Sequence, residues 1–198
     1  KCKIALIRNF VDEAPLEVIK KKNLFRQSNR FVFVGSLSSR KQPLALLAAA
    51  ARLRSQGVTF HIDIIGDGPL YNKVIKKIDE LSLWDYVIVH GHLSNPFDLV
   101  VAADVLVLPS LSEGASRAVL EALHLGVPVV LRQVDGNDEI IQENVNGALF
   151  KDSEELPKVM LKALNLRKNL LPYESLLPDT ARQSFCSIQY MRLLEDIK

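Results

Sequence analysis

The sequence predicts an α/β fold in which a parallel sheet carries helices on both faces. Short runs that are apolar on both sides of a strand recur along the chain, and a segment with apolar residues at helical spacing follows each of them. Strands buried on both faces are typical of parallel sheets, whose crossover connections are helices. A helical tail is expected after Phe150, because only helical patterns follow that residue.

Each element is predicted from its own pattern. The apolar runs predict five strands, at 31–35, 59–65, 86–89, 105–109 and 127–131, and a further strand at 3–7. The helical patterns predict helices at 43–56, 70–83, 96–103, 116–125, 138–142, 154–166 and 179–197. Gly57 ends the first of these helices, and 171–178 reads as a loop. We therefore expect one domain over residues 1–178 and a C-terminal helix over 179–198.

Composition excludes several classes of protein. Hydrophobic residues make up 48% of the 198 residues, enough for a sizeable core. The formal net charge of +2 is too small for a general nucleic-acid binder, so no nucleic-acid partner is expected. No apolar run approaches the roughly 20 residues of a membrane-spanning helix. Cys2 and Cys186 lie far apart and are interpreted as thiols in a reducing, cytoplasmic compartment.

Ligands of such sheets bind outside the carboxyl ends of the strands, so the loops after residues 35, 66, 90, 109 and 132 should surround one crevice. The loop after residue 109 leads into a helix whose first backbone N–H groups could bind phosphate. Gly114 and Ala115 leave room for a ligand, and Ser116 and Arg117 begin the helix. Glu113 is either a ligand-binding group or a helix cap, since a carboxylate there stabilises by about 0.3–1 kcal/mol.

Glu121 lies inside this helix among apolar neighbours. An ionised carboxylate is costly there unless it is paired or hydrogen-bonded. The two hydroxyl groups of a ribose would satisfy its two oxygens. The alternative is a structural partner, either Arg117 one turn earlier or Arg132. Because Glu121 is expected to be buried, we favour the ligand over a structural partner.

Two more loops carry candidate residues. Arg40 and Lys41 follow Gly35 at a helix start, where cations oppose the helix dipole. A diphosphate held between the two cations would explain this position. The alternative is a solvated surface pair. For Arg40 the two interpretations have equal weight, and for Lys41 the diphosphate is favoured. Gly66 and Gly68 lack the third glycine of a dinucleotide-binding motif, so a tight turn facing the crevice is the favoured interpretation.

No essential metal or cofactor is expected. His90 and His92 follow the third strand, but without clustered Cys, Asp or Glu they make a poor metal site, and the sequence has no Asp-x-Asp triplet. The segment from Gly136 to Glu139 is another small-residue loop, in which Glu139 is either a cap or a ligand.

These segments, taken in order, resemble family 4 glycosyltransferases over about residues 4–150. The resemblance includes the Glu113-to-Glu121 spacing with its flanking segments 103–110 and 126–130. Segments similar to other family motifs are 34–41, 65–69, 136–139 and 7–12, the last resembling the entry to the C-terminal domain.

The resemblance implies a Rossmann-like nucleotide-sugar-binding domain, the C-terminal half of a GT-B fold. It implies a retaining glycosyltransferase that works without metal and passes a sugar from a nucleotide diphosphate sugar to a glycan or lipid-linked acceptor, in polysaccharide or lipopolysaccharide assembly. Glu113 would contact the donor sugar as the catalytic residue, Glu121 the ribose, and Lys41 the diphosphate. The rest of the donor site would be Gly35, Arg40, Gly66, Gly68, His92, Gly114, Ala115, Ser116 and Arg117.

The sequence departs from the family pattern at Ser36, where Arg is usual, and at 115–117, where Phe-Gly-Leu is more common. The second departure leaves the sugar open. We also expect this chain to be part of a longer protein whose N-terminal domain carries much of the acceptor site and docks at the inner face of the membrane. The last helix would pack toward that domain through an apolar face formed by Phe185, Ile188, Met191 and Leu194.

Two other functions remain open. One is a nucleotide-sugar 2-epimerase of the same fold, against which the spacing of Glu113 and Glu121 argues. The other is a non-catalytic nucleotide-binding module. Titration with UDP, GDP and ADP would separate these functions, because an absence of binding would favour the non-catalytic module over the two enzymes.

Overall fold

The computed structural model describes residues 9–21, 28–134, 136–171 and 173–195. The strand expected at 3–7 and Cys2 lie outside these residues. Within them, six strands form one parallel sheet in the order β3-β2-β1-β4-β5-β6. The strands are β1 (Arg30–Val34), β2 (His61–Ile65), β3 (Val87–Gly91), β4 (Val105–Leu108), β5 (Val129–Arg132) and β6 (Gly147–Phe150).

The order of the strands reverses between β1 and β4. Val32 of β1 lies opposite Asp63 of β2 on one side and Leu106 of β4 on the other, in parallel register on both. The first half of the sheet thus extends from β1 to β3. The chain then returns to the free side of β1, where β4, β5 and β6 form the second half. Such a reversal opens a crevice at the carboxyl ends of the two central strands.

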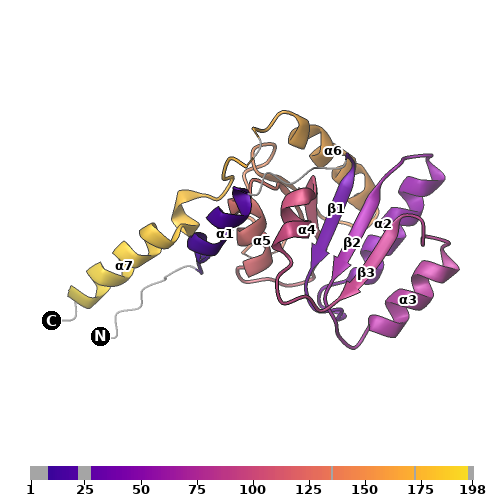
Figure 1. The fold of residues 1–198 in the computed structure, drawn as a ribbon, viewed down its shortest axis with the longest axis horizontal. Helices are drawn as coiled ribbons and strands as arrows, with labels where there is room; N and C mark the ends of the chain where they lie inside the picture. Colours follow the sequence, from indigo (N-terminus) through magenta and orange to yellow (C-terminus); the bar gives the residue numbers. More distant parts are fainter. Residues whose placement is uncertain (1–8, 22–27, 135, 172, 196–198) are drawn as a thin grey trace.

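Helices cover both faces of this sheet (Figure 1). On one face α2 (Pro43–Ser55) packs against α3 (Tyr71–Glu80) and α6 (Leu156–Lys168). On the other, α1 (Glu13–Lys20) packs against α4 (Phe97–Ala102) and α5 (Arg117–His124). All four residues of β4 are buried between these layers, as the continuous apolar run predicts. The predicted α/β class is confirmed.

Two elements escaped the sequence analysis. Helix α1 begins after Asp12, whose Oδ1 accepts a hydrogen bond of 3.2 Å from the backbone N–H of Ala14. The buried residues of α1 are Leu16 and Ile19. The Asp12 cap and the three-residue spacing of these two residues are patterns from which the helix could have been predicted. Strand β6 has four residues and begins with a glycine, which is too short for periodicity to identify, and its pairing with β5 decides its conformation.

Two predicted helices are wrong in detail. Residues 136–140 form a hydrogen-bonded turn, in place of a helix at 138–142. The Asn137 side chain there donates to the backbone of Arg132, and Asn146 Oδ1 accepts from the N–H of Gln142. Such side-chain bonds compete with helix formation. The tail consists of a 3₁₀ turn (Asp179–Ala181), an extended Arg182 and α7 (Gln183–Glu195), rather than one helix from 179.

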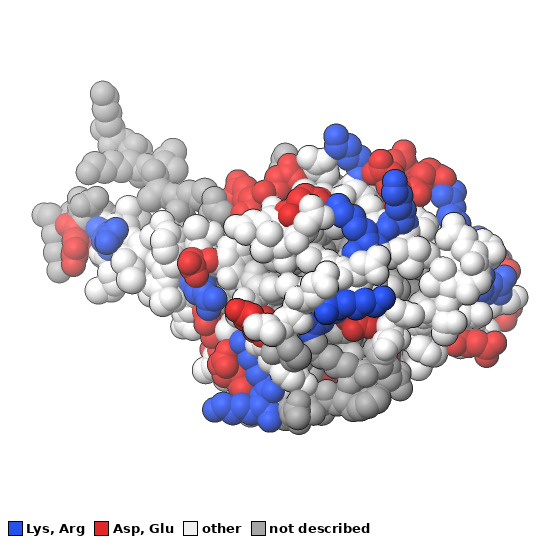
Figure 2. All heavy atoms as spheres, turned by 90° about the horizontal axis from the view of Figure 1, so that it is seen from above, with Lys and Arg blue, Asp and Glu red and all other residues white. Residues whose placement is uncertain are grey.

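Helix α7 projects away from the sheet (Figure 1). Four of its apolar side chains, Phe185, Ile188, Met191 and Leu194, are between 37% and 58% exposed. Cys186, in contrast, is buried, and its thiol donates to the carbonyl of Thr180. The described Lys and Arg side chains on the face in Figure 2 are interspersed with Asp and Glu. Among the described residues, no helix has the length and apolar character to cross a membrane.

Candidate functional site

The loops that follow β1 and β4 meet at the reversal of strand order. Their backbones are joined directly, because the N–H of Leu111 donates to the carbonyl of Arg40 over 2.8 Å. The Arg40 guanidinium donates in return to the carbonyl of Ser112, also over 2.8 Å. The two loops thus form one structural unit at the carboxyl edge of the sheet.

Lys41 and Glu113 form a buried ion pair within this unit. Lys41 Nζ lies 2.5 Å from Glu113 Oε1, and the two side chains are 10% and 6% exposed. Arg40 Nη1 reaches the same oxygen at 3.4 Å, from a side chain that is half exposed. Glu113 is therefore bound to cations of the β1 loop and does not cap α5, which begins four residues later. Two cations facing one carboxylate leave a net positive charge at this point.

A groove of about 580 Å³ continues from this point across the ends of β1, β2 and β3. Gly35, Gly66 and His92 line it, three of the residues predicted for the donor site. Asp67 and Leu93 belong to its wall as well. Gly68 is not among the described lining residues.

Packing between loops explains why position 66 is a glycine. Its φ is +145°, and a Cβ there would lie 1.9 Å from the carbonyl oxygen of Gly35. The neighbouring loops are also tied by hydrogen bonds from Leu37 to Asp67 and from Gly35 to Ile65. The glycine is required by this close approach of two backbones, which also shapes the wall of the groove.

A buried polar group beneath the groove was missed by the sequence analysis. Asp63 of β2 accepts from Arg30 Nε at 2.5 Å and lies 2.7 Å from His90 Nε2. His90 therefore points back to the sheet, while His92, two residues on, faces the groove. In the described parts of the chain, no three His, Cys, Asp or Glu side chains are grouped as metal ligands would be.

Glu121 of α5 is mostly buried, with 15% of its side chain exposed. Burial raises the pKa of its carboxyl group, and Arg117 partly offsets that effect. Arg117 Nη2 lies 3.6 Å away on a side chain that is 76% exposed, too distant for a hydrogen bond. Arg132, the other cation considered as a partner, donates instead to the carbonyl of Lys151 and to Ser153 Oγ. Of the two structural partners considered, only Arg117 contacts Glu121.

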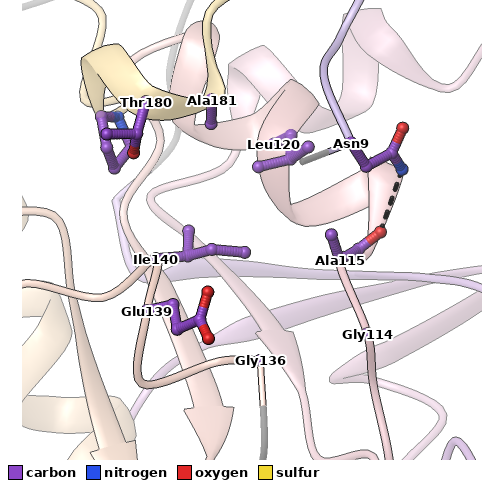
Figure 3. Close-up of a pocket in the computed structure, with 10 residues that line it drawn as sticks. Asn9, Gly114, Ala115, Leu120, Gly136, Glu139, Ile140, Thr180 and Ala181 are labelled. Atoms are coloured by element: carbon purple, nitrogen blue, oxygen red, sulfur yellow. Dashed lines mark hydrogen bonds between the residues drawn. The ribbon is translucent and has the colours of Figure 1, made fainter. Parts of the chain in front are cut away.

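A second depression, of about 370 Å³, lies beyond Gly114 and Ala115 (Figure 3). Asn9 forms part of its wall, and its side-chain amide donates to the carbonyl of Ala115 at 3.2 Å. This bond ties the segment before α1 to the loop that carries Glu113. Ser116 is buried at the N-cap of α5 without a side-chain cap bond, so the first N–H groups of the helix have no side-chain acceptor from it.

A further buried group joins α1 to α5. His124 is 1% exposed, and its Nε2 lies 2.8 Å from Glu17 Oε1 of α1. Burial lowers the pKa of His124, Lys20 acts in the same direction, and the two carboxylates of α1 oppose them. Glu13 in turn accepts from the backbone N–H of Gln183, so α1 also holds the start of α7.

Eight of the twelve predicted site residues fall into three places. Arg40, Lys41 and Glu113 are in contact; Gly35, Gly66 and His92 share the groove; Gly114 and Ala115 border the second depression. The other four, Gly68, Ser116, Arg117 and Glu121, are outside the described lining of the groove and of the second depression.

Comparison with known proteins gives a consistent result. Residues 16–173 match the family described as glycosyl transferases group 1. An Escherichia coli protein named UDP-Gal:alpha-D-GlcNAc-diphosphoundecaprenol alpha-1,3-galactosyltransferase is 31% identical over 138 residues, which are 67% of this chain and 36% of the relative. The N-acetyl-alpha-D-glucosaminyl L-malate synthase of Bacillus anthracis is 26% identical over 152 residues, 74% of this chain and 40% of the relative. The chain thus spans about two-fifths of the length of these relatives.

Solved structures share the fold. Anabaena HepE in complex with UDP and glucose matches 96% of this chain with a TM-score of 0.77 and 20% identity, over 56% of its own length. The apo form of the lipopolysaccharide outer core galactosyltransferase WaaB matches 98% with a TM-score of 0.76 and 19% identity, also over 56% of its length. These neighbours are GT-B glycosyltransferases, and the comparisons give no support to the epimerase alternative.

Proposed function

Because the chain belongs to the glycosyl transferases group 1 family, we propose that it is the donor-binding part of a retaining glycosyltransferase. The whole enzyme moves a sugar from a nucleotide diphosphate sugar to a glycan or lipid-linked acceptor. The bond between the anomeric carbon and the diphosphate oxygen breaks, and the diphosphate keeps the electron pair. The acceptor hydroxyl oxygen bonds to the anomeric carbon, and its proton passes to the departing diphosphate.

The contact of Lys41 and Arg40 with Glu113 carries this proposal. The diphosphate gains negative charge as it leaves, and cations already positioned at that point stabilise the transition state. Lys41 is buried, so its attraction for phosphate is less screened than that of a surface lysine. Glu113 is in contact with these cations, and in this proposal it contacts the sugar next to the diphosphate.

The remaining donor contacts follow the layout of the edge. The groove at Gly35, Gly66 and His92 extends away from Lys41 and accommodates the base. Glu121 accepts hydrogen bonds from the ribose hydroxyls, which compensate for its burial better than the exposed Arg117 does. The N–H groups at the start of α5 face the phosphates or the sugar. Donor binding requires no metal in this proposal.

The acceptor is held largely by a further, N-terminal domain of the longer protein. The exposed apolar face of α7 is suited to pack against that domain. The name of the Escherichia coli relative includes a sugar linked to diphosphoundecaprenol. By analogy, we expect a lipid-linked or polysaccharide acceptor and a place in the cytoplasm, at the inner face of the membrane.

Calorimetric titration of the 198-residue chain with UDP, GDP and ADP, in the presence of EDTA, tests the donor site. We expect one of the three to bind, and we would begin with UDP, which is present in the HepE complex. A Lys41→Met variant should bind the same nucleotide at least tenfold more weakly. No heat with any of the three at millimolar concentration would favour a scaffold over a transferase.

A further inference from the structure

Strand β3 departs from regular pairing where it ends, beside the groove. The register between β2 and β3 shifts there, because Ile65 lies opposite Gly91 and His90 is an extra residue between two pairs. Such a bulge redirects the side chains that follow it. Gly91 has a φ of +70°, and its carbonyl accepts a hydrogen bond of 2.7 Å from the N–H of Gly66. The chain leaves the bulge with His92 in the wall of the groove.

The side chain of the extra residue is fixed by Asp63. His90 Nε2 lies 2.7 Å from Asp63 Oδ1, and the other carboxylate oxygen accepts from Arg30 Nε at 2.5 Å. Only 2% of the Asp63 side chain is exposed, so these contacts replace the water that a carboxylate would otherwise bind. Asp63 thus joins β1 to the bulge at the end of β3.

We propose that Asp63 is a positioning residue for nucleotide binding, which holds His90 in the bulge and so sets the direction of residues 90–93. The inference rests on the proposed function, in which the groove accommodates the base. Asp63 is not among the described residues that line the groove, so its effect passes through His90 to His92. An apolar side chain at this position would avoid the cost of burying a carboxylate, so stability alone does not account for Asp63.

Substitutions on both sides of the contact test this role. Asp63→Val removes both acceptor oxygens and suits a buried strand. Asp104→Val is the matched control, since Asp104 is another carboxylate bonded to Arg30, through the backbone N–H, at the amino ends of β1 and β4. His90→Phe keeps a ring without its nitrogens, whereas the side-chain amide in His90→Gln can still donate to Asp63.

Calorimetry with UDP, GDP and ADP measures binding to the 198-residue chain and its variants, and urea denaturation shows that each variant is folded. We expect Asp63→Val and His90→Phe to weaken binding of the nucleotide about tenfold, while His90→Gln and Asp104→Val stay within about twofold of the wild type. In the absence of nucleotide, the backbone amide NMR shifts of residues 90–93 should change in the same two weakened variants.

Each other outcome decides against the inference. Unchanged affinity in Asp63→Val and His90→Phe would overturn it, while binding by the wild type would leave the proposed function standing. Equal losses in His90→Phe and His90→Gln would also overturn it, because the hydrogen bond to Asp63 would then have no effect. If Asp63→Val does not fold, the two His90 variants decide. A wild type that binds none of the three nucleotides would reject the proposed function and this inference with it.

Discussion

Lys41 Nζ and Glu113 Oε1 lie 2.5 Å apart, although 72 residues separate them in the sequence. This contact joins the loops of the two central strands at the point where strand order reverses. It also places the cation proposed for the diphosphate against the carboxylate proposed for the sugar. A diphosphate that binds Lys41 shares its ammonium group, which has three N–H donors, with Glu113, so in this proposal donor binding is coupled to the position of this carboxylate.

Replacing Lys41 by Met should lower the free energy of unfolding by about 1–3 kcal/mol, because Glu113 would remain buried with only the more distant Arg40. The double variant Lys41→Met/Glu113→Gln should lose less than the sum of the two single variants. Urea denaturation measures all three. The exposed Lys76 serves as control, since Lys76→Met should change stability by no more than about 0.5 kcal/mol. Strict additivity would contradict the coupling.

Glu121→Ala should weaken binding of the nucleoside diphosphate by about 1–3 kcal/mol, the usual cost of losing hydrogen bonds to a charged group. Calorimetry with the nucleotide identified for the wild type measures the change. Glu80→Ala removes an exposed carboxylate on α3 and should leave the affinity as it is. Equal affinities for wild type and Glu121→Ala would reject the ribose contact.

The stability conferred by residue 121 should depend on pH. Burial raises the pKa of Glu121 above its ordinary value of 4.5, so the folded protein holds this proton more tightly than the unfolded chain does. Below pH 4.5 the carboxyl group is protonated in both states, so burial of the charge does not lower the free energy of unfolding. Above the raised pKa the buried group is ionised, and the free energy of unfolding is lowered by the full cost of burying the charge. Relative to Glu121→Gln, the wild type should lose stability as pH rises from 4 towards 8. A constant difference in urea midpoints across that range would disprove the effect.

His124 should give the opposite dependence. Burial lowers its pKa from 6.5, so the unfolded chain binds a proton that the folded protein resists. Wild-type stability should therefore fall, relative to His124→Gln, as pH drops through 6.5 towards the lowered pKa. The charged groups that face His124 are Glu13, Glu17 and Lys20. The hydrogen bond from Lys20 lowers the pKa of Glu17 below 4.5, so Glu17 does not titrate in the pH range in which His124 does. His61→Gln, at an exposed site, should show no such trend.

Two glycines of the site should respond differently to alanine. Gly66→Ala should destabilise the protein by about 3 kcal/mol or more, because its φ is +145° and the new Cβ would strike the carbonyl of Gly35. At Gly114 a Cβ would meet nothing within 4 Å. Gly114→Ala should therefore change stability by only about 0.5 kcal/mol. Similar melting temperatures for the two variants would show that the Gly35–Gly66 contact is looser than described.

The residues of the candidate site were predictable where the local sequence pattern depends on them. The sequence places Gly35 to Lys41 and Glu113 to Arg117 in loops between a strand and a helix, and parallel strands bring such loops to one edge. Glu121 was identified as buried because its helical neighbours are apolar, and the structure agrees. The group of Arg30, Asp63 and His90 was missed, since each residue comes from a different strand and only the pairing of the strands brings them together.

The sequence by itself determined the alternation of buried strands and helices, and hence a parallel α/β sheet, because hydrophobic periodicity depends on near neighbours in the chain. Only the tertiary structure decided which side chains meet. The strand order, which sequence does not encode locally, puts β1 beside β4 and so pairs Lys41 with Glu113. It also brings Asn9 and Thr180, near opposite ends of the chain, to the same depression. Such contacts depend on long-range packing, and no spacing along the chain reports them.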